Sequence, residues 1–328
     1  MNRRTFLTNV ATVATVAIAP DFLRAVAGQR SDEKSLCQNL CTIKDDDSQT
    51  GKIKRAIDYP YDRAVSSYLF VQDGMTLCGK GFQYIKVDKD DPMSSGSVLR
   101  TPEGTASIPE FLKRYRLSSS LNSARTAVIG YGSNPAVEQL ARKFGHHKDY
   151  GPFCGDPVIP VIKARIKDFD VVYMGHIASY GSVGATFAAS PGTEAEIWLT
   201  FLTADQLKRM HETESVGRVY DYGILEVPIT LENGHSIHGA SIYIDRFGAL
   251  VWNDDLISLT KVNASSRKFP SLREDQMLDR LRARFSPGAQ LEQFILENIG
   301  NAQKRDERNS ILHEITRRFS STAFRVIA

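Results

Sequence analysis

The residues best suited to chemistry form a glycine-rich turn, residues 130–134, with the sequence Gly-Tyr-Gly-Ser-Asn. Glycine lets the backbone approach a ligand closely and adopt positive φ. The first amides of a helix that follows such a turn have no partners inside the helix, and with the helix dipole they attract an anion. The turn is therefore a candidate binding loop for a carboxylate, although the same composition is common in ordinary turns.

A second candidate is Glu214, which lies near the end of a short helix expected to begin after Thr203. A carboxylate held in a cleft can accept and return a proton, which is general acid–base catalysis. Glutamates at helix ends are also common as solvated charges, and Glu212 lies close by on the same helix. The residue type alone leaves both interpretations open.

Apolar patterns predict the elements that position these groups. Residues 127–129 form a short apolar run typical of a buried strand, and Val137, Leu140 and Phe144 recur at helical spacing after the turn. The turn would therefore join a strand to a helix, an arrangement in which the helix start faces whatever the loop binds.

The junction between the turn and this helix can also be predicted. Asn134 is a favoured N-cap residue, and Pro135 suits the first helical position. Apolar runs, alternation and turn residues predict further elements downstream. They are strands at residues 169–173, 184–188 and 197–202, a turn at residues 190–192, a helix at residues 204–212, and a hairpin of residues 222–229 and 237–244 that turns at Asn233 and Gly234.

The turn resembles the Tyr-Gly-Ser-Asn hallmark that follows the first strand in the gamma-glutamylcyclotransferase family. Other segments resemble the family in the same order, so that the similarity covers roughly residues 125–245. The resemblance implies an α+β fold with a gamma-glutamylcyclotransferase-like mixed β-sheet or small barrel, peripheral helices, and N- and C-terminal extensions. The similar segments are residues 131–134, 164–169, 184–186, 190–192 and 205–214.

The resemblance also implies roles for individual residues. Glu214 is the position that matches the general acid/base of the family. The implied reaction is intramolecular: the base deprotonates the α-amine of a small gamma-glutamyl compound or peptide, and this amine attacks the γ-carbonyl and releases 5-oxoproline. The reaction needs no metal and no other cofactor. The substrate-binding residues implied by the resemblance are Tyr131, Gly132, Ser133, Asn134 and Tyr222.

Three positions depart from the family pattern. Pro135 replaces an apolar residue, Ser215 stands where glycine is usual, and Ile197 where glycine is frequent. Two alternatives therefore stay open: a non-catalytic module that binds a small molecule or peptide in the same pocket, and an acyl- or amide-transfer enzyme on the same scaffold. The cyclotransferase interpretation requires Glu214 to face the binding loop across a cavity.

The start of the chain resembles a twin-arginine export signal. Residues 2–7 read Asn-Arg-Arg-Thr-Phe-Leu, an apolar stretch occupies residues 10–20, and residues 25–27 offer a small-residue cleavage site. The apolar stretch is too short to span a bilayer as a helix. We therefore expect a signal peptide at residues 1–27 and a periplasmic or otherwise exported mature protein without a stable membrane span; an uncleaved anchor is the alternative.

Charge and cysteine content narrow the function classes. Without residues 1–27 the chain has 38 basic and 37 acidic residues, a balance that argues against nucleic acid as a partner. An exported protein can form disulfides, and four cysteines allow two of them, with the pairing left open. The cysteines are Cys37, Cys41, Cys78 and Cys154.

A metal site is weakly indicated. His146 and His147 are adjacent and would point in different directions on a helix, and Cys154 lacks the paired pattern of zinc ligands. We therefore expect no metal.

The chain is expected to divide into four segments, with the oligomeric state left open. They are the signal peptide at residues 1–27, an N-terminal extension with strands at residues 28–122, the gamma-glutamylcyclotransferase-like domain at residues 123–262 and a C-terminal helical segment at residues 263–328.

Overall fold

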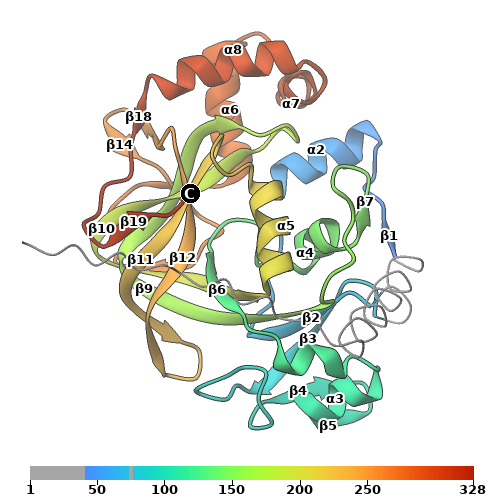
Figure 1. Ribbon diagram of the computed structural model, residues 1–328. Coiled ribbons are helices and arrows are strands. Elements are labelled where there is room, and N and C mark those ends of the chain that lie inside the picture. The colour runs from blue at the N-terminus through green and yellow to red at the C-terminus, as the bar shows by residue number, and fades with distance from the viewer. Residues whose placement is uncertain (1–40, 74–76) are drawn as a thin grey trace, which may run out of the picture.

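The computed structural model describes residues 41–73 and 77–328, so the predicted signal peptide lies outside the described residues. At its centre is a closed five-stranded barrel with helices packed around it (Figure 1). This confirms the expectation of an α+β fold with a small mixed barrel. The barrel strands are β6 (Thr126–Gly130), β9 (Val158–Ile177), β10 (Val183–Leu202), β11 (Tyr220–Leu231) and β12 (Ser236–Asp245).

The hydrogen-bonded order around the barrel is β10, β6, β12, β11 and β9, and β9 pairs again with β10. Only the β6–β12 pair is parallel. The hairpin of β11 and β12 turns at Asn233 and Gly234 as predicted, and Gly234 has φ 85°. Closing the sheet removes free edges in the barrel. It also brings the C-terminal end of β6 and the start of β11 to the same end of the barrel.

Residues 190–192 do not form the predicted turn between two strands. They lie inside β10, where the register against β9 shifts between Ala189 and Glu194. Gly192 has φ 85°, and its amide donates to Asp168 Oδ1 at 2.8 Å. A β-bulge bends a strand without ending it. The Ser-Pro-Gly composition therefore marks curvature of one long barrel strand.

The N-terminal extension joins the barrel sheet through β2, which pairs with the first residues of β9. A disulfide joins Cys41 to Cys78; Cys37 lies outside the described residues. Tyr59 and Arg63 lie in the segment that this disulfide closes, between α2 and β2. The elements are β1 (Thr42–Ile43), α2 (Gln49–Ile57), β2 (Tyr68–Val71), β3 (Lys80–Lys86), β4 (Val98–Thr101), β5 (Gly104–Ser107), α3 (Ile108–Arg114) and the 3₁₀ helix η1 (Ser118–Asn122).

Two short helices follow barrel strands and contact each other, α4 (Val137–Phe144) after β6 and α5 (Ala204–Glu214) after β10. Thr203 caps α5 as predicted, through its hydroxyl and the Gln206 amide. Between α4 and β9 the chain forms β7 (His146–His147), which pairs with β1, and β8 (Gly151–Pro152). The two helices thus bring the loop after β6 next to the C-terminal end of α5.

The C-terminal segment, residues 263–328, contains helices and several short strands. In Figure 1 its three helices lie above the barrel, and α8 packs on β9 while α7 contacts α2. The elements that follow β12, of which the first three precede residue 263, are β13 (Ala249–Trp252), β14 (Asp255–Leu256), β15 (Ser258–Leu259), β16 (Ala264–Ser265), β17 (Ser271–Leu272), α6 (Glu274–Phe285), α7 (Leu291–Gly300), α8 (Ala302–His313), β18 (Thr316–Arg317) and β19 (Phe324–Val326).

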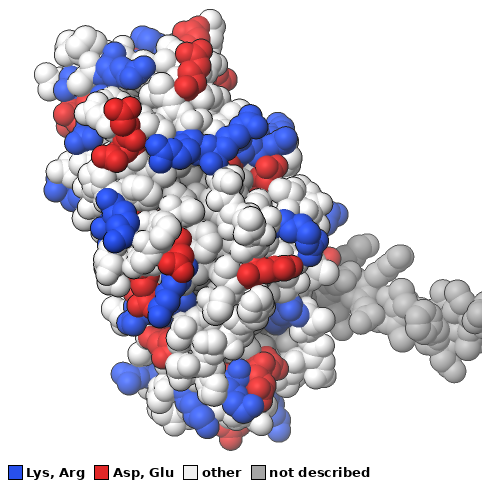
Figure 2. Space-filling model, turned by 90° about the vertical axis from the view of Figure 1, so that its left-hand side faces the viewer, with Lys and Arg blue, Asp and Glu red and all other residues white. Residues whose placement is uncertain are grey.

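Acidic and basic side chains are interspersed on the face shown in Figure 2, where neither sign forms one continuous field. Within the described ranges, no helix has the length and apolar character that a bilayer span requires.

Candidate functional site

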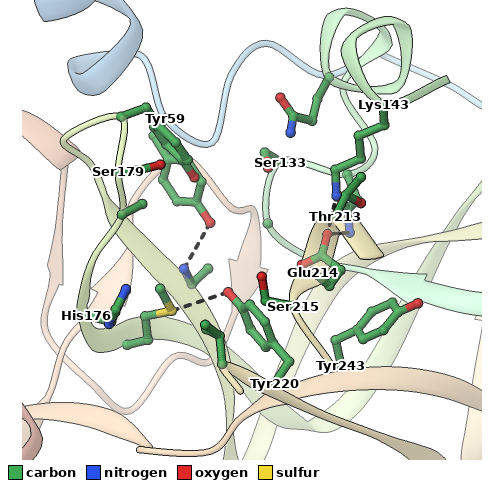
Figure 3. Close-up of a pocket in the computed structure, with 18 of the residues that line it drawn as sticks. Tyr59, Ser133, Lys143, His176, Ser179, Thr213, Glu214, Ser215, Tyr220 and Tyr243 are labelled. Carbon is green, nitrogen blue, oxygen red and sulfur yellow. Dashed lines mark hydrogen bonds and ion pairs between the residues drawn. The ribbon is translucent and has the colours of Figure 1, made fainter. Parts of the chain in front are cut away.

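The candidate binding loop, residues 130–134, and Glu214 line the same cavity of about 270 Å³ (Figure 3). Its walls come from every region of the described chain: the loop after β6, helices α4 and α5, barrel strands, the N-terminal extension and α8. The residues used below are Tyr59, Tyr131, Gly132, Ser133, Asn134, Lys143, Met174, His176, Ser179, Glu214, Ser215, Tyr220, Tyr243, Arg305 and Asp306.

Glu214 is the last residue of α5, and Ser215 ends the helix in the left-handed conformation with φ 53°. The Glu214 side chain is 13% exposed. Its Oε1 accepts a hydrogen bond from Asn134 Nδ2 at 3.0 Å and forms an ion pair with the Lys143 ammonium group. Neither donor reaches Oε2, and no described residue donates to that oxygen. One oxygen is thus fixed while the other stays available in the cavity.

Lys143 is the partner that the sequence did not indicate. It lies three residues after Leu140 on α4, so the two share a helix face that turns toward the core. Its side chain is only 3% exposed. The ammonium bonds Asn134 Oδ1 at 2.8 Å, contacts Met210 Sδ at 3.5 Å and pairs with Glu214. A buried charge of this kind is stable only when paired, so the three side chains form one unit.

Asn134 is not the N-cap of the following helix, in contrast to the prediction. The helix begins at Val137 with Ala136 as N-cap, and the Ala136 amide bonds the Ser133 carbonyl at 2.9 Å to form a turn. This turn frees the Asn134 side chain to bridge Lys143 and Glu214. The Asn134 side chain therefore forms hydrogen bonds with two charged groups in the wall of the cavity. The N-terminus of α4 has no side-chain cap.

The carbonyls of the binding loop are held from outside by the N-terminal extension. Arg63 Nη2 donates to the carbonyl oxygens of Tyr131 at 2.6 Å and Gly132 at 3.1 Å. In a trans peptide the carbonyl and the next amide point in opposite directions. The amides of Gly132 and Ser133 are therefore directed away from Arg63, and neither has an acceptor among the described residues.

Gly132 is required by close packing. A Cβ at this position would lie 2.8 Å from the Tyr59 hydroxyl oxygen, which accepts a hydrogen bond from the Ala185 amide at 2.9 Å. Any side chain at Gly132 would push the loop and Tyr59 apart. Tyr131 anchors the loop on its other side, since its hydroxyl donates to the Tyr243 carbonyl at 2.5 Å. Burial raises the pKa of Tyr131 well above its usual value, so its phenol stays protonated.

Tyr222, predicted to bind substrate, does not line this cavity. Its ring packs edge-on against His211 at a centroid distance of 4.5 Å and lies 5.3 Å from the Tyr243 ring. Tyr220 lines the cavity instead, and its hydroxyl lies 3.3 Å from Met174 Sδ. The two tyrosines share one face of β11, because alternate residues do. The sequence pattern could not decide which of them reaches the cavity.

The candidate metal ligands His146, His147 and Cys154 do not form one cluster in the structure. The described residues contain one His/Asp group of suitable spacing, Asp45, His147 and Asp149, without His146 or Cys154. Asp45 already accepts Arg55 Nη1 at 2.5 Å and Arg142 Nε at 2.8 Å. Two guanidinium groups repel a cation, so the donor set does not suit a metal.

No protein-family model matches the chain, and a search of curated proteins found no match. Among the solved structures that match, two are similar at a low level. One, titled gamma-glutamyl cyclotransferase, is 16% identical, with 61% of this chain and 95% of that chain covered and a TM-score of 0.30. The other, an uncharacterized protein from Homo sapiens, is 17% identical, with 61% and 96% covered and a TM-score of 0.29. Because these TM-scores are low, the function has to be argued from the cavity itself.

Proposed function

We propose that this protein is a gamma-glutamylcyclotransferase-like enzyme that releases 5-oxoproline from a small gamma-glutamyl amide or peptide. The observation that carries the proposal is that Glu214 lies beside a loop whose Gly132 and Ser133 amides have no acceptor among the described residues, within one cavity. The predicted signal peptide adds the proposal that the enzyme acts after export.

In the proposed reaction Glu214 is the general base and then the general acid. Its Oε2 takes a proton from the α-ammonium group of the substrate, and the nitrogen attacks the γ-carbonyl carbon to close a five-membered ring. The ring nitrogen of the tetrahedral intermediate then gives up a second proton, and the bond to the leaving nitrogen breaks. Glu214 passes both protons in turn to the leaving nitrogen. The products are 5-oxoproline and an amine in its ammonium form, so atoms and charge balance without a co-reactant.

The amides of Gly132 and Ser133 would stabilise the negative charge that develops on the γ-carbonyl oxygen. Arg63 holds the preceding carbonyls, so the amides need no reorganisation during the reaction. Lys143 and Asn134 hold Oε1 of Glu214 and thereby aim Oε2. Since the nucleophile and the carbonyl belong to one substrate, the folded substrate conformation supplies much of the acceleration.

The ion pair of Lys143 with Glu214 also favours a second candidate, a non-catalytic binding module. A carboxylate that is already neutralised by an ammonium group can serve as a fixed polar wall of a pocket. In that case the same loop would hold the carboxylate of a small molecule or peptide, and no product would form.

The test is 5-oxoproline release from gamma-glutamyl dipeptides, gamma-glutamyl amines and glutathione. We expect release by the wild type and a loss of about 10²-fold or more in Glu214→Gln. The matched control is Glu212→Gln, because Glu212 lies on the same helix turn with a side chain that is 57% exposed. Equal losses in both variants would exclude Glu214 as the base. No release from any substrate by the folded wild type would favour the binding module.

A further inference from the structure

Ser215, the residue after the proposed base, has a backbone conformation that is unfavourable for a side chain. It ends α5 with φ 53° and ψ 48°, in the left-handed region, where the β-carbon of any residue other than glycine is crowded. Its carbonyl accepts the amides of Arg218 and Val219, each at 3.0 Å, so the turn into β11 fixes this conformation. Glycine commonly occupies such helix ends without this cost. The serine side chain at this position therefore needs an explanation from its surroundings.

The Ser215 side chain is directed into the cavity. Figure 3 shows it on the same side of the cavity as Glu214, next to Tyr220, whereas His176 lies on the opposite side. The Ser215 hydroxyl forms no hydrogen bond with any described residue, and the Tyr220 hydroxyl is already directed at Met174 Sδ at 3.3 Å. The Ser215 side chain thus stabilises no element by hydrogen bonding. It adds one uncommitted hydroxyl beside the carboxylate of Glu214.

The proposed reaction brings a group with several hydrogen-bond donors to this point. It places the α-ammonium group of the substrate at Oε2 of Glu214, within reach of the residue that follows Glu214 in the chain. An ammonium group has three N–H donors, and a serine hydroxyl oxygen can accept one that the carboxylate does not take. Two acceptors fix the orientation of the nitrogen, so that its lone pair points at the γ-carbonyl carbon once the base has taken the proton.

We propose that the Ser215 hydroxyl binds the α-ammonium group of the substrate together with Glu214, and that this contact is the reason for a side chain at residue 215. The inference rests on the proposed cyclotransferase function and makes Ser215 a substrate-binding residue of this chain. Functional residues often reduce the stability of the fold that carries them. A substitution at residue 215 that relieves the backbone should therefore impair binding of the ammonium group, which a purely structural serine would not do.

Ser215→Gly and Ser215→Ala test the role of the hydroxyl. Ser215→Gly relieves the left-handed conformation, so we expect a melting temperature at or above that of the wild type. In both variants kcat/KM for gamma-glutamylalanine should fall about 10-fold or more, as for the loss of one hydrogen bond to a charged group. The matched control is Ser266→Gly, because Ser266 has φ 54° on the exposed surface and does not line the cavity. It should keep the wild-type kcat/KM. Wild-type kcat/KM in either Ser215 variant overturns the inference.

A binding measurement separates this inference from the proposed function, which 5-oxoproline release by the wild type reports. N-Glutarylalanine has the carboxylates and the amide of gamma-glutamylalanine but lacks the ammonium group. Calorimetric titration of Glu214→Gln with both ligands reports binding without turnover. Adding Ser215→Ala should weaken binding of gamma-glutamylalanine about 10-fold and leave binding of N-glutarylalanine unchanged. This result supports the ammonium contact even when the wild type releases no 5-oxoproline. Equal changes for both ligands, or no binding of gamma-glutamylalanine to folded Glu214→Gln, overturn it and leave the cyclotransferase standing where release is observed.

Discussion

The two ends of the cavity differ in how their polar groups are satisfied. At one end Glu214, Lys143 and Asn134 bond one another, so the geometry is complete before a ligand arrives. At the other end His176 Nδ1 has no described partner, and Arg305 is held by one nitrogen. A group of paired charges suits chemistry because it needs little reorganisation. Unpaired donors suit recognition because the ligand completes them.

The largest effect should come from breaking the paired end. Lys143→Met keeps the side-chain length but leaves the buried Glu214 carboxylate without its cation. We expect the free energy of unfolding to fall by about 3 kcal/mol, as when one partner of a buried ion pair is removed. Chemical denaturation measures this loss. A matched measurement on the double variant Lys143→Met/Glu214→Gln should recover at least half of it, because both charges are then gone. Additive losses would mean that the two groups do not act as a pair.

The unpaired end should show itself in the pH dependence of stability. Burial lowers the pKa of His176 to about 4 from 6.5. The unfolded chain takes up a proton below pH 6.5 that the folded chain refuses until about pH 4, so folding loses stability as pH falls through this window. At pH 5 the loss is about 2 kcal/mol.

His176→Gln tests this dependence. The drop in unfolding free energy between pH 7 and pH 5 should be smaller in the variant by about that amount. His211 and His313, whose pKa values burial also lowers, remain in both proteins and provide a common background. An unchanged drop would show that the His176 imidazole of the folded protein has a pKa close to its ordinary value. The two ends of the cavity would then differ less than proposed.

The sequence indicated the paired end only in part. The Gly-Ser-Asn turn can be predicted from its composition between a strand and a helix, whereas Glu214 is indicated only by the family resemblance; both line one cavity in the structure. Lys143 cannot be predicted as a partner because a lysine on a helix is usually solvated. The local sequence favours Asn134 as a helix cap, because it does not show that a distant lysine and carboxylate offer this side chain other partners.

Groups contributed by distant segments were beyond sequence reasoning. Arg63 and Arg305 lie far apart along the chain, and the fold places Arg305 in the wall of the cavity and Arg63 behind the loop that forms another part of this wall. The length of β10 could not be predicted for the same reason, because a Ser-Pro-Gly sequence is compatible with a bulge inside one strand as well as with a turn between two strands. The choice between them depends on whether the neighbouring strand β9 continues past the bulge, which is a property of the pairing. Local pattern thus predicted the elements, while their long-range contacts determine which side chains meet.

Arg63 belongs to the N-terminal extension, but it contacts the loop at the end of the cavity where Glu214, Lys143 and Asn134 bond one another. It holds the carbonyls of Tyr131 and Gly132, and through them it orients two amides. Arg63→Met should lower kcat about 10-fold with a smaller change in KM, because a misplaced loop weakens transition-state contacts more than ground-state binding. Arg63→Lys should recover part of kcat, since an ammonium group can reach one carbonyl.

The control for this prediction is Arg100→Met, which removes an exposed arginine from β4 of the same N-terminal extension. It should leave kcat and KM unchanged. A loss in Arg63→Met that appears only as a lower melting temperature, with wild-type kcat for the folded fraction, would make Arg63 a purely structural anchor. The loop would then be held in place by Tyr59 of the extension and by Tyr131, without a contribution from Arg63 to catalysis.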